Sequence, residues 1–260
     1  MIRIKNLHKS YGSLEVLKGL SLDVEDGVIL VILGRSGVGK SVLFKQILGI
    51  EQPDAGEIEI DGESVTSSKR HVSQKLVKSM SMLFQGGALF DSMTVGDNVA
   101  FFLDQHGDPK TGNRLEPDEI RKRVKESLEM VDLAGTEKKM PSELSGGMRK
   151  RAALARAIIS EPKYIFYDEP TTGLDPITAM QINRLIIKTQ KKLKGTTVVV
   201  THDIRSALEL ADILALHDEG VIKFKASKQD FMHIDDPQIQ AFFTEAMVTP
   251  EIIKKNRGEE

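Results

Sequence analysis

The chain has 260 residues, of which 40% are hydrophobic and 28% are charged, and its formal net charge is −2. This composition is typical of a globular protein with one or two domains and excludes a disordered or fibrous chain. The balanced charge excludes the broad basic field with which proteins bind nucleic acid or anionic lipid. Because the chain contains no cysteine, disulfides, thiolate metal sites and cysteine nucleophiles are also excluded.

Apolar patterns predict the strands. Residues 2–7 and 56–62 alternate between apolar and polar side chains, which indicates half-buried antiparallel strands. Residues 28–33, 164–167 and 197–200 are short continuous apolar runs, as expected for parallel strands covered on both faces. Helical periodicity fits residues 40–48, 117–131, 147–159, 177–193 and 204–211. We therefore predict an α/β fold with a parallel-sheet core and an antiparallel β subdomain near the N-terminus.

The segment GRSGVGKS at 34–41 fits the pattern G-x-x-x-x-G-K-[ST], and it lies between a predicted strand and a predicted helix. Glycines let backbone N–H groups turn toward phosphates, the lysine reaches the β and γ phosphates, and the serine hydroxyl binds Mg²⁺. The expected nucleotide-binding residues here are Gly34, Arg35, Ser36, Gly37, Val38, Gly39, Lys40, Ser41 and Val42.

A second motif, YIFYDE at 164–169, is an apolar strand that ends in two acids. Asp168 is expected to hold Mg²⁺ together with Ser41, because ligands bind at the carboxyl ends of strands in α/β sheets. Glu169 is expected to orient the attacking water, and Lys40 to stabilise the transferred phosphoryl group. These two motifs predict a P-loop ATPase that uses ATP and Mg²⁺ and forms no covalent intermediate.

A third motif, LSGGM at 144–148, precedes a predicted helix. Ser145, Gly146 and Gly147 would form a second anion-binding helix start, which one nucleotide cannot easily reach within a single chain. The motif resembles the signature of the ABC (ATP-binding cassette) ATPases. This resemblance implies a homodimer in which two copies lie head to tail and each signature completes the ATP site of the other copy.

The same resemblance implies roles for four more residues. Tyr11 matches the aromatic residue that stacks on adenine, and Gln85 matches the Q-loop glutamine that contacts Mg²⁺ and links the site to membrane subunits. Asp175 lies in a segment that resembles the D-loop. His202 matches the histidine that binds the γ-phosphate. Taken singly, a tyrosine or histidine at such a position is more often structural.

The resemblance covers residues 1–225, and it implies a helical subdomain at about 86–160. Residues 226–260 form a tail that is expected to contact the dimer mate or a partner, and residues 236–243 within it are expected to form a short helix that a proline begins. The run Arg149, Lys150 and Arg151 is interpreted as a solvated helix face.

Several details resemble the ATPase subunits of Mla and Mce-type lipid transporters of the bacterial envelope. Met148 stands where many ABC ATPases have a polar residue such as glutamine, and segments 82–85, 87–95, 97–99 and 140–144 also resemble this subgroup. The implied partners are a polytopic permease, an MCE-domain lipid-binding protein and a STAS-domain protein, and no nucleic acid. The implied location is the cytoplasmic face of the inner membrane, as a peripheral subunit.

Two questions stay open at the level of sequence. Leu89, Phe90, Met93 and Val95 are expected either to dock a permease helix or to pack in the interior. The alternatives to lipid transport are an ABC importer or exporter for another solute and a soluble ATPase of the iron-sulfur-assembly type.

Overall fold

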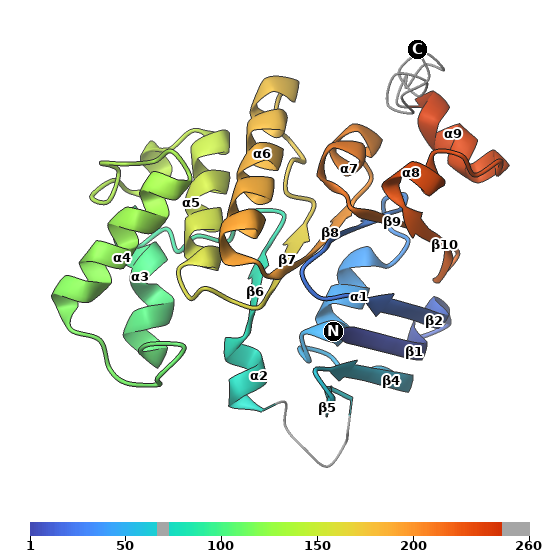
Figure 1. Cartoon of the computed structure of the whole chain (residues 1–260), viewed down its shortest axis with the longest axis horizontal. Coiled ribbons are helices and arrows are strands. Elements are labelled where there is room, and N and C mark those ends of the chain that lie inside the picture. The colour runs from blue at the N-terminus through green and yellow to red at the C-terminus, as the bar shows by residue number, and fades with distance from the viewer. Residues whose placement is uncertain (67–72, 246–260) are drawn as a thin grey trace. The chain divides into compact units, whose positions relative to one another are not determined.

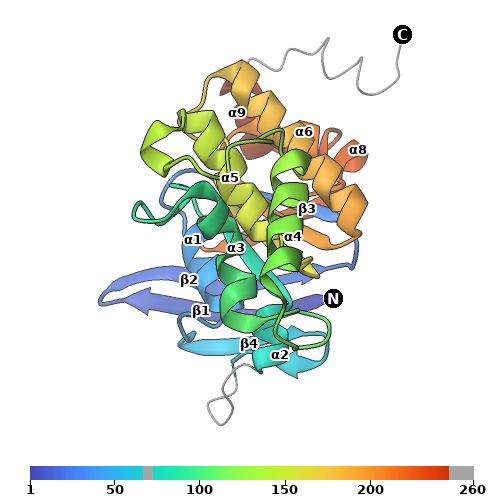
Figure 2. The ribbon, with the colours of Figure 1, turned by 90° about the vertical axis from the view of Figure 1, so that its left-hand side faces the viewer.

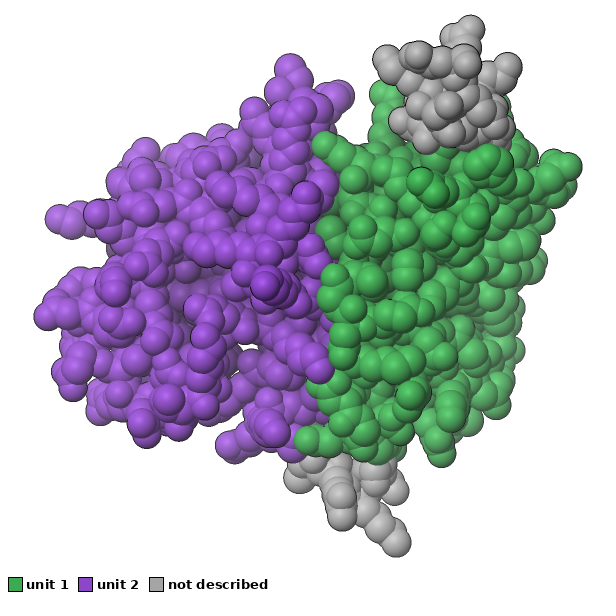
Figure 3. All heavy atoms as spheres, viewed as in Figure 1, with its two compact units in different colours: residues 1–72, 198–260 green, residues 73–197 purple. Residues whose placement is uncertain are grey.

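The computed structural model describes residues 1–66 and 73–245, so the predicted tail beyond residue 245 lies outside the described part. The chain divides into two compact units, residues 1–72 with 198–260 (unit 1) and residues 73–197 (unit 2), which Figure 3 shows in green and purple. Within the described residues, no helix is long and apolar enough to cross a membrane.

Unit 1 contains an antiparallel sheet with the strand order β2, β1, β4, β5. These strands are β1 (Ile2–Tyr11), β2 (Leu14–Val24), β4 (Ala55–Ile60) and β5 (Glu63–Ser64). Ile2 pairs with Val24 on one side and with Ile60 on the other, and all three side chains are buried. Alternation in the sequence predicted β1 and β4 of this sheet, because a period of two turns one face of each strand toward the core, whereas β2 and β5 were not predicted.

A second group of strands in unit 1 carries the parallel pairing. β3 (Ile29–Leu33) runs parallel to β9 (Ile213–Asp218), and β10 (Val221–Ser227) runs antiparallel to β9. Every residue of β3 is buried, which is the reason for its continuous apolar run. β8 (Thr196–Thr201) is likewise buried along its whole length. The predicted parallel α/β core is confirmed.

The helices of unit 1 are α1 (Lys40–Ile47), α7 (Ile204–Leu210), α8 (Lys228–Phe231) and α9 (Pro237–Glu245). Figure 1 labels them along the chain. The periodicity of the sequence predicted α1 and α7 within one residue at each end. The helix that Pro237 was expected to begin is present as α9. A proline at the first helical position has no N–H to leave unpaired, so it starts a helix well.

Unit 2 contains the parallel pair β6 (Met80–Leu83) and β7 (Tyr164–Asp168), in which Leu83 lies opposite Tyr167. Its helices are α2 (Gln74–Lys78), α3 (Val95–His106), α4 (Pro117–Met130), the 3-10 helix η1 (Pro141–Glu143), α5 (Gly146–Ile158) and α6 (Pro176–Leu193). Helices α3, α4 and α5 pack against one another, and α5 also packs against α6; Figure 2 shows the first three side by side.

Helix α3 is the largest element that the sequence analysis did not predict. Its start carries a capping box, in which the Asp97 N–H donates to Thr94 Oγ1 at 3.1 Å and the Thr94 N–H donates to the Asp97 carboxylate at 3.3 Å. Two orphan helix donors are satisfied in this way. The pattern Thr-x-x-Asp ahead of an apolar run was therefore a usable signal for the helix.

Candidate active site

The glycine-rich loop of unit 1 follows β3 and ends at α1. A Cβ on Gly34 would lie 2.6 Å from the carbonyl oxygen of His217, and a Cβ on Gly39 would lie 2.6 Å from Cγ1 of Val16. Gly39, the N-cap of α1, also has a φ of 105°, where a side chain would be strained. Glycine is thus required at both ends of the loop by close packing, and at Gly39 by backbone conformation as well.

Lys40 fills the inside of this loop. Its side chain is buried, and its ammonium donates to the carbonyls of Gly34 at 2.6 Å and Arg35 at 2.9 Å. Arg35, Ser36 and Gly37 form the exposed rim above it. A cation enclosed by backbone at the start of a helix fits an anionic phosphate group, because the helix dipole and the ammonium both favour negative charge there.

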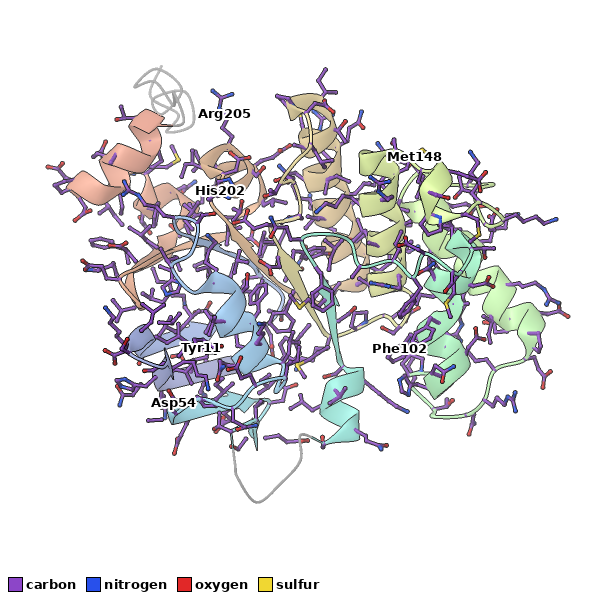
Figure 4. All side chains as sticks on the ribbon, turned by 180° about the vertical axis from the view of Figure 1, so that it is seen from behind. Tyr11, Asp54, Phe102, Met148, His202 and Arg205 are labelled. Carbon is purple, nitrogen blue, oxygen red and sulfur yellow. The ribbon has the colours of Figure 1, made fainter. Side chains whose placement is uncertain are left out.

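Tyr11, at the end of β1, is held by a small polar network of unit 1. Its hydroxyl donates to the Glu51 carboxylate at 2.7 Å, and the Lys9 ammonium lies 5.6 Å from the centre of its ring. Asp54 accepts from Lys9 Nζ at 3.2 Å and from the Ser10 N–H at 2.7 Å, and Figure 4 labels Tyr11 and Asp54 on this sheet. Tyr11 is 44% exposed, so its ring is both fixed and accessible to a flat ligand.

His202 directly follows β8 and is exposed. The carbonyl of the preceding residue, Thr201, accepts from the N–H of Gly34 at 3.3 Å, so the end of β8 lies beside the start of the glycine-rich loop. The next residue, Asp203, caps α7 by accepting from the Arg205 N–H at 3.0 Å. The histidine is therefore located where a strand ends next to the candidate phosphate loop.

His217 is a residue beneath this loop that the sequence analysis missed. It is fully buried on β9, and its ring carbon Cε1 would lie 3.5 Å from a Cβ on Gly39. Burial, together with the positive charge of Lys40, lowers the pKa of His217 to about 4, against the opposing charge of Asp218. No sequence motif marks this residue, because its position depends on the pairing of β9 with β3.

In unit 2, the predicted Q-loop glutamine and the two predicted acidic residues lie at the same edge of the parallel pair β6 and β7. Gln85 lies two residues beyond Leu83 on β6, and Glu169 lies two residues beyond Tyr167 on β7. Because parallel strands end at the same edge, Gln85, Asp168 and Glu169 share this edge.

The Glu169 backbone is unusual for a residue other than glycine. Its φ is 49°, in the left-handed region, and its carboxylate accepts from Thr172 Oγ1 at 3.0 Å. Both Asp168 and Glu169 are only 7% exposed. A left-handed conformation at such a residue costs free energy that the surrounding structure must offset, and it is commonly found at functional sites.

The interpretation of residues 149–151 as a solvated helix face is wrong for Lys150. It was expected on a solvated helix face, but its side chain is buried and its ammonium donates to the carbonyl of Gln85. Burial lowers the pKa of Lys150, while the nearby charges of Asp168 and Glu169 act to raise it. Helical periodicity places a residue on a face, but only packing decides whether that face meets solvent.

The serine-glycine turn lies at the start of α5. Ser145 is the N-cap, and its side chain accepts from the Met148 N–H at 3.3 Å; Figure 4 labels Met148 there. A Cβ on Gly147 would lie 2.6 Å from Cγ2 of Thr178 on α6. Glycine at 147 thus allows α5 and α6 to approach closely.

A hollow of about 660 Å³ opens beside this turn, and Asp175 lines it together with the residues from Ser145 to Met148. Asp175 is the N-cap of α6 and accepts from the N–H groups of Ile177 at 3.1 Å and Thr178 at 3.0 Å. The hollow brings together two predicted groups, the signature-like turn and the D-loop-like aspartate.

The apolar residues after Gln85, which were expected either to dock a permease helix or to pack in the interior, differ in their burial. Val95 is fully buried at the start of α3 and belongs to the interior. Phe90 is 42% exposed, and its ring lies 4.9 Å from that of Phe101. Leu89 and Met93 are half-buried.

The residues predicted to bind the metal ion are Ser41, Gln85 and Asp168. Among the described residues, no cluster of three or more His, Cys, Asp or Glu side chains is suited to hold a metal ion. Ser41, Gln85 and Asp168 offer only oxygen donors. Such a small set of protein oxygens is compatible with Mg²⁺, because this ion is usually bound by only one or two carboxylates together with substrate phosphates and water.

Comparisons with known proteins place this geometry in a family. A sequence model of the family described as ABC transporter matches residues 17–172. The chain is 40% identical to the "Intermembrane phospholipid transport system ATP-binding protein MlaF" of Escherichia coli (strain K12), over 93% of this chain and 88% of that protein. It is 36% identical to the "Probable ribonucleotide transport ATP-binding protein mkl" of Mycobacterium leprae (strain TN), over 96% of this chain and 70% of that protein.

A solved structure agrees with the sequence matches. The ATP-binding cassette MJ0796, as a dimer in a post-hydrolysis state bound to ADP and Pi, has a TM-score of 0.78 and 30% identity, and the match covers 88% of this chain and 99% of that one. The chain therefore belongs to the ABC transporter family and is an ATPase of that family, which works with ATP and Mg²⁺.

Proposed function

We propose that this chain drives transport of phospholipid, or of another hydrophobic molecule, across the bacterial envelope, as the ATPase subunit of an Mla or Mce-type transporter. The identity to the MlaF protein over most of both chains supports this cargo. The protein mkl, whose name refers to ribonucleotides, is less similar and is matched over a smaller share of its length. The cargo itself would touch other chains, chiefly a permease.

Two copies of the chain are proposed to lie head to tail around two ATP molecules. The observation that carries this proposal is that each chain has two anion-binding helix starts, one at Lys40 on α1 and one at Ser145 on α5. The hollow beside Ser145 is open and is not filled by the chain's own side chains. A phosphate group held by Lys40 of one copy would complete its coordination at Ser145, Gly146 and Gly147 of the other copy.

Each site residue has a proposed role within this arrangement. Tyr11 stacks on adenine, and the loop from Gly34 to Val42 holds the phosphates. Ser41, Gln85 and Asp168 hold Mg²⁺, which neutralises charge on the β and γ phosphates when it is bound. Glu169 orients the attacking water, His202 donates to the γ-phosphate, and Asp175 lies along the dimer seam.

Hydrolysis is proposed to control dimer closure. Moving such an equilibrium from mostly open to mostly closed takes about 5.5 kcal/mol of differential binding, which two nucleotides held from both sides can supply. Loss of the γ-phosphate contacts at Lys40 and Ser145 then releases the dimer. The proposed domains are residues 1–225 for the cassette, with a helical subdomain at about 86–160, and a C-terminal tail that contacts the mate or a partner.

The proposed partners are an integral membrane permease, an MCE-domain protein and a STAS-domain protein, with the chain on the cytoplasmic face of the inner membrane. Affinity purification of the full chain from its host membrane, followed by mass spectrometry of bound proteins and lipids, tests this assignment. Recovery of a permease together with phospholipid is the expected result. Recovery of soluble iron-sulfur assembly proteins in place of a permease would contradict it.

The variant Glu169→Gln tests the catalytic assignment. The amide keeps the size of the side chain but cannot attract a proton from water, so we expect MgATP binding to persist while turnover falls by a factor on the order of 10³. Size-exclusion chromatography with MgATP should then show a stable dimer of the variant. Wild-type turnover by this variant would assign water activation to another group.

A further inference from the structure

Two cations of helix α5 hold the short loop that follows β6. The Lys150 ammonium donates to the carbonyl of Gln85. The Arg156 guanidinium donates to the carbonyls of Gly87 at 3.1 Å and Ala88 at 2.7 Å. We call residues 85–88 the Gln85 loop. Three of its backbone carbonyls therefore accept hydrogen bonds from side chains of the single helix α5.

The Gln85 loop has a conformation that needs such support. Gly87 and Ala88 have φ values of 78° and 49°, and the second of these is unfavourable for a residue with a Cβ. The Gly87 N–H donates to the carbonyl of Phe84, the residue before the loop, at 2.8 Å. Hydrogen bonds from charged donors are stronger than neutral ones, so the two cations hold this turn in place.

The burial of Lys150 makes its contribution hard to replace. Lys150 is 6% exposed, so a shorter or uncharged side chain at this position would leave the Gln85 carbonyl without its charged donor. The carboxylates of Asp168 and Glu169 also act on this ammonium. Arg156 is half-buried, with its guanidinium 5.7 Å from the centre of the Phe90 ring.

The same helix begins at the serine-glycine turn. α5 runs without a break from Gly146 to Ile158, with Ser145 as its cap. An α-helix of 13 residues is stiff on this scale, because each backbone N–H is paired along the axis. A displacement of the Ser145 turn is therefore transmitted to Lys150 and Arg156, and through them to the Gln85 loop.

We propose that Lys150 and Arg156 are positioning residues that couple the Ser145 turn to the Gln85 loop, so that a nucleotide engaged at the start of α5 sets where the Gln85 side chain lies. This inference rests on the proposed function, because it assumes that the turn and Gln85 both serve ATP hydrolysis. Helix α5 and the Gln85 loop would then face two different nucleotides. The start of α5 would contact the nucleotide held by the partner copy, and Gln85 would serve the chain's own ATP site.

Lys150→Met and Arg156→Met in the full chain test the coupling, since methionine keeps an unbranched apolar chain and removes the donors. The expected result is a fall in kcat by a factor on the order of ten to a hundred, while KM for MgATP stays within about twofold. Hydrogen-deuterium exchange over residues 84–93 should become faster. Lys150→Arg, which keeps a charged donor, should recover most of both readouts, and Lys122→Met on the exposed surface of α4 should behave as wild type.

Lys40→Ala and Glu169→Gln in the same assay separate this inference from the proposed function. If these two variants keep full turnover, the proposed ATPase site is wrong. If they lose turnover while folded Lys150→Met and Arg156→Met keep wild-type kcat and exchange, the coupling is wrong. A failure of Lys150→Arg to recover either readout would also overturn it, because the loss would then come from packing alone.

A thermal melt of each variant identifies those that do not fold. Should the methionine variants unfold, Arg156→Lys decides the question, because lysine keeps the charge but lacks the fork that reaches both carbonyls. Intermediate kcat and intermediate exchange over residues 84–93 support the coupling. Wild-type values of both overturn it.

Discussion

The two helix starts that are proposed to bind phosphate, those of α1 and α5, are built differently. At α1 the cap is Gly39, which has a left-handed backbone and no side-chain cap, and a buried lysine supplies positive charge inside the loop. At α5 the cap is Ser145, whose side chain pairs with a backbone N–H, and the turn itself contains no charged residue. The first start is suited to hold a phosphate tightly, whereas the second offers only N–H and hydroxyl donors.

This difference suggests a division of labour. Under the proposed function, the charge-assisted site would keep nucleotide bound when the second copy is absent, while the neutral site would add enough affinity to close the dimer and still allow release. The α5 start also lies close to α6 at Gly147, and further along the same helix Lys150 and Arg156 hold the Gln85 loop.

The largest expected effect comes from removing the charge at α1. Lys40→Ala should weaken MgATP binding by at least a hundredfold, because two or more hydrogen bonds to a charged group, each worth about 1.5–3 kcal/mol, are lost. Titration with a fluorescent ATP analogue measures the Kd. Lys45→Ala, an exposed lysine one turn along the same helix, is the matched control. Equal affinity of the Lys40 variant and the control would contradict the role of the α1 loop.

A second effect concerns the histidine below the α1 loop. Burial and Lys40 lower the pKa of His217 to about 4, and the pKa in the unfolded chain is about 6.5. Between these values the unfolded chain binds a proton that the folded chain does not, so this residue costs stability as pH falls from about 6.5 toward about 4. The loss between pH 7 and pH 5 should be about 2 kcal/mol.

Urea unfolding of the wild type and of His217→Met at both pH values measures that loss. The ring nitrogens have no hydrogen-bond partner among the described residues, so the variant should lose less stability than the wild type on acidification. If both lose stability in parallel, the histidine titrates with its ordinary pKa.

A third effect is expected at the packing of α5 against α6. Gly147→Ala would place a Cβ 2.6 Å from Thr178, whereas a Cβ on Gly146 would be 3.8 Å from Leu174. We expect Gly147→Ala to destabilise the fold by about 1–3 kcal/mol through overpacking, and Gly146→Ala to be nearly neutral for stability. Thermal unfolding of the two variants, which differ by one position, provides the comparison. A more stable Gly147 variant would show that the two helices can move apart at little cost.

Sequence reasoning predicted the elements whose local pattern agrees with their final environment. The apolar run of β3, the alternation of β1 and β4, and the helices α1, α5 and α6 all follow from periodicity. The segments 34–41 and 164–169 were found because phosphate and metal chemistry demand particular residues at fixed spacing. Helix α3 was not predicted although its capping box was present, because the apolar residues at 89–95 fitted a docking surface and interior packing equally well.

The α/β class and the family could be read from the sequence alone, and so could the segments expected to carry the chemistry, since each of these depends on contiguous residues. Three contacts could be known only from the folded chain: Lys150 is buried against Gln85, His217 lies under Gly39, and Ser145 and Asp175 share one hollow. These contacts join residues that are distant along the chain. Their free energies depend on desolvation and on distance, which no local pattern contains.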